Sequence, residues 1–71
     1  MANVYVEPLP KGSTAPITGY KLEYAGGQSV DGVTHRTQET AIAEAKRLGH
    51  SPLVARVRVT DKGKPDHWRA A

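Results

Sequence analysis

Cysteine is absent from the 71 residues of this chain, which excludes disulfides and thiolate metal sites as sources of stability. A chain of this length makes one domain and buries only about 60% of the surface of its unfolded state. We therefore expect a single domain over residues 1–71, with a thin core and with flexible ends at 1–2 and 66–71. Small domains without cross-links often depend on close packing or on self-association.

Long apolar runs are absent too. No stretch approaches the ~20 residues that a membrane-spanning helix requires. The start of the chain, MANVYVEPLP, has neither the basic residues nor the apolar run of a signal peptide. Both absences favour a cytoplasmic protein without a membrane partner.

Residue patterns typical of metal sites and catalytic sites are missing as well. Zinc sites usually contain a closely spaced ligand pair, and no such pair exists among His35, His50 and His67. The glycines belong to no phosphate-binding loop. The candidate carboxylates for acid–base chemistry fall in expected turns or on the solvent face of a helix, namely Asp31, Glu39, Glu44, Asp61 and Asp66. We expect no catalytic residue, no metal, no cofactor and no enzymatic activity.

The net charge of +3 is unevenly distributed along the chain. Residues 1–34 carry a charge of −1, whereas residues 35–71 contain eight Lys and Arg against four acidic residues. A basic half permits a polyanionic partner. An ordinary solvated surface explains the same asymmetry, so the charge alone identifies no partner.

The pattern of residues 37–52 predicts a helix over about residues 38–48. Thr37 can cap its first turn, and Gly49 stands where a left-handed residue ends many helices. One apolar stripe recurs at helical spacing, formed by Ala41, Ile42, Ala45 and Leu48. Because two of these residues are alanines, the helix can approach a sheet closely.

Short alternating segments before the helix predict strands. The first is Val4-Tyr5-Val6, which Pro8 and Pro10 end. The second spans residues 17–24, with Tyr20, Leu22 and Tyr24 on one face and Lys21 and Glu23 on the other. Residues 28–35 predict a third strand, with a turn or bulge at Asp31-Gly32.

Residues 53–60 predict the strand after the helix, because apolar and basic side chains alternate there. We expect Arg56 and Arg58 on the solvent side. The residues expected to face the helix are Leu53, Ala55, Val57 and Val59. A turn follows at residues 61–64, and residues 66–69 either pair back as a short strand or form a tail.

The order of these signals resembles a family of short bacterial domains of unknown function with a strand–strand–helix–strand pattern. The matching pieces are the valine strand before Pro8, the aromatic strand at residues 20–24, the segment HRTQETAIAEAKRL, the strand at 53–60 and the turn Asp61-Lys62-Gly63. A longer proline-rich loop at residues 8–16, and tyrosine where the family often has tryptophan in the second strand, depart from that pattern. The resemblance implies a fold and a bacterial source, and it brings no established activity.

Together these features predict an α+β fold. One helix packs on a small, mostly antiparallel sheet of three to four strands, in the order strand, strand, optional third strand, helix, strand. The helix would cover one face of the sheet and leave the other open. The residues expected on the open face are Tyr5, Lys21, Arg56 and Arg58, and those expected at its end, near Trp68, are Lys62, Lys64 and Arg69.

Two functions are compatible with such a surface. The first is a non-enzymatic interaction module that binds another protein or itself as a homodimer, through a sheet face made apolar by Tyr5, Val54 and Trp68. The alternative is weak, sequence-tolerant binding of nucleic acid or another polyanion, with contacts from Arg56, Arg58, Lys62, Lys64 and Lys21. A purely structural interpretation is also open, in which Arg56 and Arg58 pair across strands with Glu23.

Overall fold

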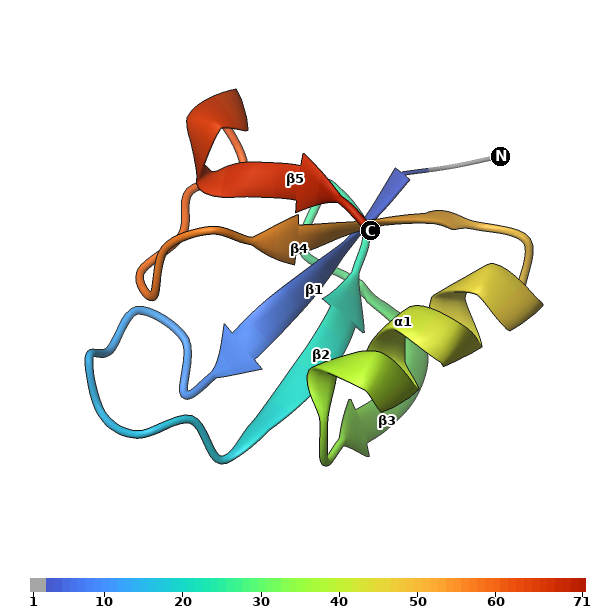
Figure 1. Cartoon of the computed structure of the whole chain (residues 1–71), viewed down its shortest axis with the longest axis horizontal. Coiled ribbons are helices and arrows are strands. Elements are labelled where there is room, and N and C mark those ends of the chain that lie inside the picture. The colour runs from blue at the N-terminus through green and yellow to red at the C-terminus, as the bar shows by residue number, and fades with distance from the viewer. Residues whose placement is uncertain (1–2) are drawn as a thin grey trace.

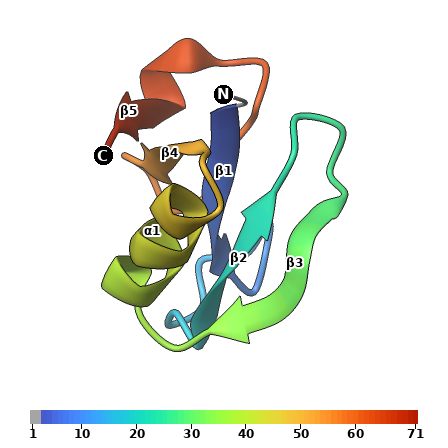
Figure 2. The ribbon, with the colours of Figure 1, turned by 90° about the vertical axis from the view of Figure 1, so that its right-hand side faces the viewer.

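The computed structural model describes residues 3–71, so residues 1–2 of the predicted flexible ends lie outside the described residues. Five strands form one sheet, and the helix α1 (Gln38–Arg47) lies against one of its faces (Figures 1 and 2). The strands are β1 (Asn3–Leu9), β2 (Gly19–Glu23), β3 (Ser29–His35), β4 (Ser51–Ala55) and β5 (Trp68–Ala70). A short 3-10 helix, η1 (Pro65–His67), leads into β5.

The predicted α+β class, with one helix on a sheet, is confirmed, but the predicted number of strands and their pairing need correction. The strand order is β3-β2-β1-β4-β5. β1 pairs antiparallel with β2 and parallel with β4, so the sheet is mixed. A parallel pair needs a long crossover connection, and here β2, β3 and α1 all lie between β1 and β4 in the sequence.

Both ends of α1 are capped by the residues that the sequence indicates. The Thr37 hydroxyl accepts a hydrogen bond from the Thr40 amide at 3.1 Å. At the other end Gly49 adopts a φ of 83°. Its amide donates to Lys46 O at 3.0 Å, and the His50 amide donates to Ala45 O at 2.9 Å. This pair of bonds is the Schellman motif, which satisfies carbonyls that would otherwise lack a partner.

The core lies between α1 and the sheet. Its fully buried members are Val4, Val6, Leu22, Ala41, Ala45 and Val54, with Tyr20, Tyr24, Val30 and Ile42 packed around them. The predicted faces of residues 20–24 are therefore confirmed. Leu48 is 40% exposed, contrary to the predicted stripe, because it forms the C-cap beyond the last helical turn.

The strand predicted at residues 53–60 is wrong in its bounds and in its orientation. β4 ends at Ala55, and its core residue is Val54. Val57 and Val59 are 40% and 46% exposed. Alternation defines two faces without saying which one is buried. The pairing of β4 with β1 extends only to Val6↔Val54, and the chain then leaves the sheet.

Residues 56–67 cross to the face of the sheet opposite α1 (Figure 2). Trp68 packs edge-on against Tyr5, with 4.7 Å between the ring centroids. Its indole N–H donates to Asp61 O at 3.1 Å. The second face of the sheet is therefore covered, contrary to the prediction that one face stays open.

Candidate functional site

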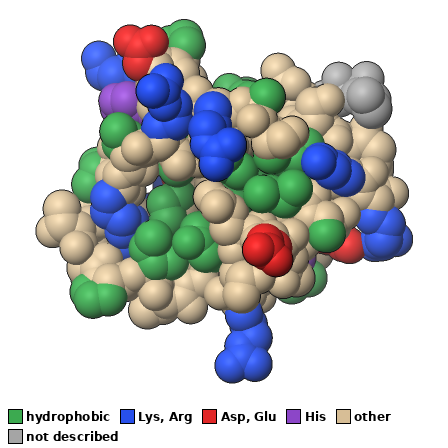
Figure 3. Space-filling model, viewed as in Figure 1, with side chains coloured by type: hydrophobic (Ala, Val, Ile, Leu, Met, Phe, Trp, Pro, Cys, Tyr) green, Lys and Arg blue, Asp and Glu red, His purple; other side chains and the backbone are tan. Residues whose placement is uncertain are grey.

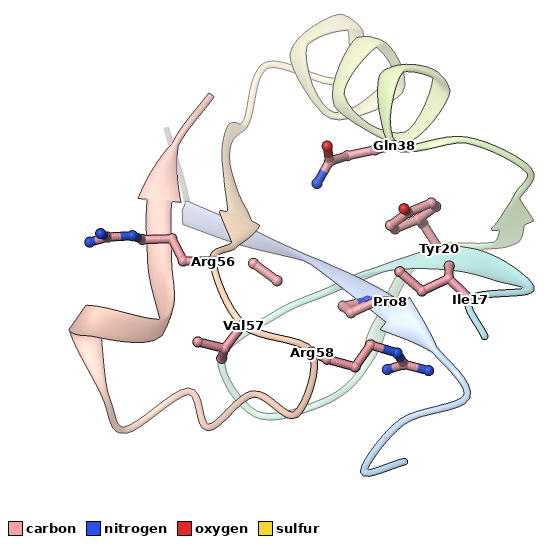
Figure 4. A pocket seen from close by; sticks show the side chains of 8 residues that line it. Pro8, Ile17, Tyr20, Gln38, Arg56, Val57 and Arg58 are labelled. Carbon is pink, nitrogen blue, oxygen red and sulfur yellow. The ribbon is translucent and has the colours of Figure 1, made fainter. Parts of the chain in front are cut away.

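A small pocket opens where the parallel strands β1 and β4 end, beside the first residue of α1. Its volume is about 240 Å³, and its lining residues are Pro8, Ile17, Tyr20, Gln38, Ala55, Arg56, Val57 and Arg58. The helix returns antiparallel to β4, so its N-terminus lies at the carboxyl end of that strand. We call this cavity the arginine pocket (Figure 4).

We call Arg56, which lines the arginine pocket, and Arg69 on the neighbouring strand β5 together the arginine rim. Arg69 stands opposite Val54 in the β4–β5 register and so shares the helix side of the sheet. The Arg56 amide donates to His67 O at 2.7 Å, which continues this ladder past the end of β4. Figure 4 shows the Arg56 side chain directed away from the pocket, on the β5 side. Both side chains are exposed, and within residues 3–71 neither has a carboxylate within ion-pair distance.

The helix side of the molecule is predominantly basic. Lys and Arg side chains are spread across this face, acidic ones are few, and apolar side chains gather in a recess left of centre (Figure 3). Lys64, the N-cap of η1, is also exposed and has no ion pair among the described residues.

Arg58 holds a loop in place. Its Nη2 donates to Pro10 O at 2.9 Å and to Ala15 O at 3.0 Å, and its Nε donates to Ala15 O at 3.2 Å. These bonds join the segment after β4 to the β1–β2 loop. The remaining nitrogen, Nη1, is buried and has no hydrogen-bond partner within the described part of the chain.

A second cluster of charges is buried on the opposite face of the sheet. Glu7 and Glu23, on the neighbouring strands β1 and β2, are each 2% exposed. Lys62 lies 2.7 Å from a carboxylate oxygen of each. The Thr60 hydroxyl donates to Glu7, and Lys11 approaches Glu23 at 3.0 Å. The cluster fastens the segment that follows β4 onto the sheet.

The pKa shifts in this cluster follow from its pairing. Burial raises the pKa of Glu23, but hydrogen bonds and charge attraction from Lys62 and Lys11 outweigh it, so that pKa is lowered. Burial likewise lowers the pKa of Lys62, but its bonds to Glu23 and Glu7 leave that pKa raised. The charged forms are therefore stabilised, as expected of a structural ion network.

The predicted contact residues do not lie on one face. Arg56 and Arg58 line the arginine pocket on the helix side, whereas Lys62 and Lys21 approach Glu23 on the other. The predicted pairing of Arg56 and Arg58 with Glu23 is also wrong, since lysines surround that carboxylate. The shortened β4 explains both differences, because neither arginine belongs to a strand.

Sequence reasoning missed Glu7, and it placed Glu23 on an exposed face, whereas both carboxylates are buried together. Glu7 lies two residues after Tyr5, on the same side of β1, and the β1–β2 register places Glu23 opposite Tyr5 and so diagonal to Glu7 on that face. The available signal was an acidic side chain on each of two alternating strands, with a lysine-rich segment elsewhere to neutralise them. Their proximity depends on strand pairing, which the sequence pattern does not reveal.

The histidines occupy separate places in the fold. His35 is buried, with its Nε2 2.8 Å from Asp31 Oδ2, and His50 packs edge-on against Tyr24. His67 Nδ1 accepts a hydrogen bond from the Asp61 amide at 3.0 Å. No group of three or more His, Asp or Glu within residues 3–71 is arranged to hold a metal ion.

Comparisons with protein-family models, curated proteins and solved structures give no match to this chain. The resemblance to short bacterial domains therefore stays a prediction. Across the described residues, no helix has the length and apolar character needed to cross a membrane.

Proposed function

We propose that this protein is a small, non-enzymatic binding module for single-stranded nucleic acid, with its contact surface on the arginine rim. The observation that carries the proposal is the placement of Arg56 and Arg69. Both are exposed, neither has a carboxylate partner among the described residues, and Arg56 belongs to the lining of a pocket that also includes Tyr20. Arginines beside an aromatic group suit phosphate contact together with base stacking.

The basic residues fall into two groups, those with an acidic partner and those without one. Lys11, Lys21 and Lys62 approach Glu23, and Arg47 pairs with Glu44. Their charges are therefore largely neutralised locally. Within residues 3–71, six basic side chains have no ion pair, namely Arg36, Lys46, Arg56, Arg58, Lys64 and Arg69. Among these six, Arg56 and Arg58 line the pocket, and Arg58 is engaged by its bonds to the β1–β2 loop.

Self-association through the sheet receives less support from the fold. One face is occupied by α1, and Thr60, Lys62 and Trp68 cover side chains of the other. The outer strand β3 also offers few amides to a partner strand. The Gly32 amide donates to Ser29 Oγ at 2.8 Å and the Val33 amide to Asp31 Oδ1 at 3.1 Å. Local bonds of this kind protect an edge from pairing.

The test is a salt titration of binding, measured by fluorescence anisotropy with a labelled single strand and with a duplex of equal length. Affinity for the single strand should fall linearly with salt on logarithmic axes. Each lost phosphate contact should reduce the slope by about 0.7. The Arg56→Ala, Arg69→Ala double variant should therefore flatten the slope by about 1 to 1.5.

The matched control is the Lys46→Ala, Arg47→Ala double variant, which removes the same charge from the last turn of α1. It should leave the slope nearly unchanged. Equal flattening in both variants would show that net charge alone drives binding, and absence of binding at low salt would remove the proposal. Sedimentation of the same samples reports whether the free protein is a dimer.

A further inference from the structure

We infer that the arginine pocket is a subsite for one unstacked nucleobase, with Tyr20 as its aromatic wall and Gln38 reading the edge of the base. This inference rests on the proposed function and adds to it a chemical preference. The rim would supply the phosphate contacts, and the pocket would supply base contacts. Phosphate contacts position a nucleic acid, whereas base contacts discriminate between sequences.

The size of the pocket fits a single flat group. Its volume of about 240 Å³ is below the roughly 300–1,000 Å³ of pockets that enclose drug-sized ligands. It is open at the surface, and Arg56 of the rim belongs to its lining (Figure 4). A base that is splayed out of a single strand can enter such a site, whereas a base paired within a duplex cannot.

The walls of the pocket are apolar and unusually exposed. Ile17 and Val57 are 46% and 40% exposed, and both line the pocket, together with buried Pro8. Exposed aliphatic side chains gathered at one cavity indicate a surface that a ligand covers. The ring of Tyr20 adds a face on which a base can stack.

Polar groups converge on the same cavity. Figure 4 shows the Tyr20 ring between α1 and β2 and the Gln38 amide extending from the start of α1 toward β4. Neither the Tyr20 hydroxyl nor the Gln38 amide has a hydrogen-bond partner among the side chains of residues 3–71. A glutamine amide presents an acceptor and two donors, which matches the donor and acceptor pattern on the edge of a base.

The alternative macromolecule is an acidic polypeptide. Its carboxylates would use the arginine rim but leave the Tyr20 face and the apolar walls without a matching group. A nucleotide has both an anionic phosphate and a flat apolar ring system, so it matches both parts of the surface. A nucleic acid therefore fits this surface better than an acidic polypeptide, and the test below includes an acidic polypeptide for comparison.

The test compares single strands that carry the same phosphates with and without bases. Labelled homopolymers of each of the four bases, and an abasic strand of equal length, are titrated with the full chain. The base-bearing strand that binds best should bind about tenfold more tightly than the abasic strand, since stacking of one base is of this order. Gln38→Ala should reduce the differences in affinity among the four homopolymers and leave the dependence of affinity on salt unchanged.

An exposed apolar pair supplies the matched control. Ile17→Ser, in the pocket, should bring the affinity for the base-bearing strand toward that of the abasic strand. Val33, on β3, is 48% exposed and lies outside the pocket. Val33→Ser should therefore leave the ratio of the two affinities, for the base-bearing strand and for the abasic strand, unchanged. Both positions are exposed, so both variants should fold, which an amide NMR spectrum verifies.

The outcomes separate the inference from the proposed function. Equal affinity for abasic and base-bearing strands, with a salt slope that the arginines control, overturns the base subsite and leaves the binding function standing. Absence of binding to any strand overturns both. Tighter binding of polyglutamate than of any strand would assign the surface to an acidic polypeptide and overturn the nucleobase subsite.

Discussion

At the scale of single residues, Lys62 joins the segment after β4 to the strands β1 and β2, which lie far from it in the sequence. It contacts Glu7 and Glu23 at 2.7 Å and lies 5.4 Å from the centre of the Tyr5 ring. The two carboxylates are buried on neighbouring strands. Without a cation between them they would repel each other in a poorly solvated place, so the lysine allows two acidic side chains to point into the same interior.

Lys62→Met tests this role. We expect the free energy of unfolding to fall by about 3 kcal/mol, because the change leaves a buried charge without its partner. Lys64→Met is the control, since Lys64 is exposed and has no ion pair within the described part of the chain, and it should change stability by less than about 0.5 kcal/mol. Urea unfolding measures both. If both variants lowered the free energy of unfolding equally, the ion pairs of Lys62 would contribute nothing beyond the effect of removing one positive charge.

At the scale of elements, the segment after β4 is attached to both faces of the sheet. Arg58 bonds to the β1–β2 loop, and Thr60 and Lys62 bond to the carboxylates on the other side. Charged and polar side chains thus attach this segment to the sheet, whereas a strand is attached by its main-chain hydrogen bonds. The exposed valines of this segment follow from the same arrangement.

Arg58→Ala should increase the mobility of the β1–β2 loop strongly and lower the stability of the whole fold only modestly. Loss of three hydrogen bonds from a charged donor to carbonyls should lower the free energy of unfolding by about 1–2 kcal/mol. Amide exchange of residues 11–18 should accelerate further than that of α1. Arg58→Lys should restore only part of the effect, because an ammonium cannot reproduce the guanidinium fork. Unchanged exchange in the loop would show that the bonds to Pro10 and Ala15 do not hold it.

The elements also show which predictions the sequence supports. The bounds and caps of α1 follow from Thr37 and Gly49, because capping depends on neighbours along the chain. The third strand and its irregularity at Asp31-Gly32 were likewise predictable, and the register shift between β2 and β3 confirms them. The end of β4 was not, because it depends on where β1 stops pairing and on bonds from Arg58 to a loop far away in the sequence.

The candidate site was predictable to a smaller extent. Arg56 stood out because it was not needed for packing, and it does lie on the rim of a pocket. Arg69, Gln38 and Tyr20 join it only through the β4–β5 register and the return of α1 along the sheet. Strand order decides these neighbours, and alternation within one strand carries no information about it.

At the scale of the whole molecule, stability depends on pH through the buried ion cluster. The pKa of Glu23 is lowered by folding, so its contribution is present above the ordinary value of 4.5 and is lost as the pH falls through the lowered pKa. The pKa of Lys62 is raised by folding, so its contribution is present below the ordinary value of 10.5 and is lost as the pH rises through the raised pKa.

The free energy of unfolding should therefore show a plateau between about pH 5 and pH 10, with a decline on each side. Urea unfolding across this range measures it. The difference between the wild-type protein and Lys62→Met should be largest on the plateau and shrink at both extremes. A difference that stays constant with pH would contradict the assignment of these two pKa shifts to the cluster.

The parallel pairing of β1 with β4 also sets the order in which the molecule can fold. The strand at the start of the chain is the central strand of the sheet, and its register joins Val4 to Pro52. During synthesis, residues 3–35 can align as three antiparallel strands, but their apolar face stays uncovered until α1 emerges. One side of the central strand stays unpaired until β4 follows. Contacts so distant in sequence slow the closing of a fold, so the apolar side chains of β1 and β2 stay uncovered until α1 and β4 have joined the sheet.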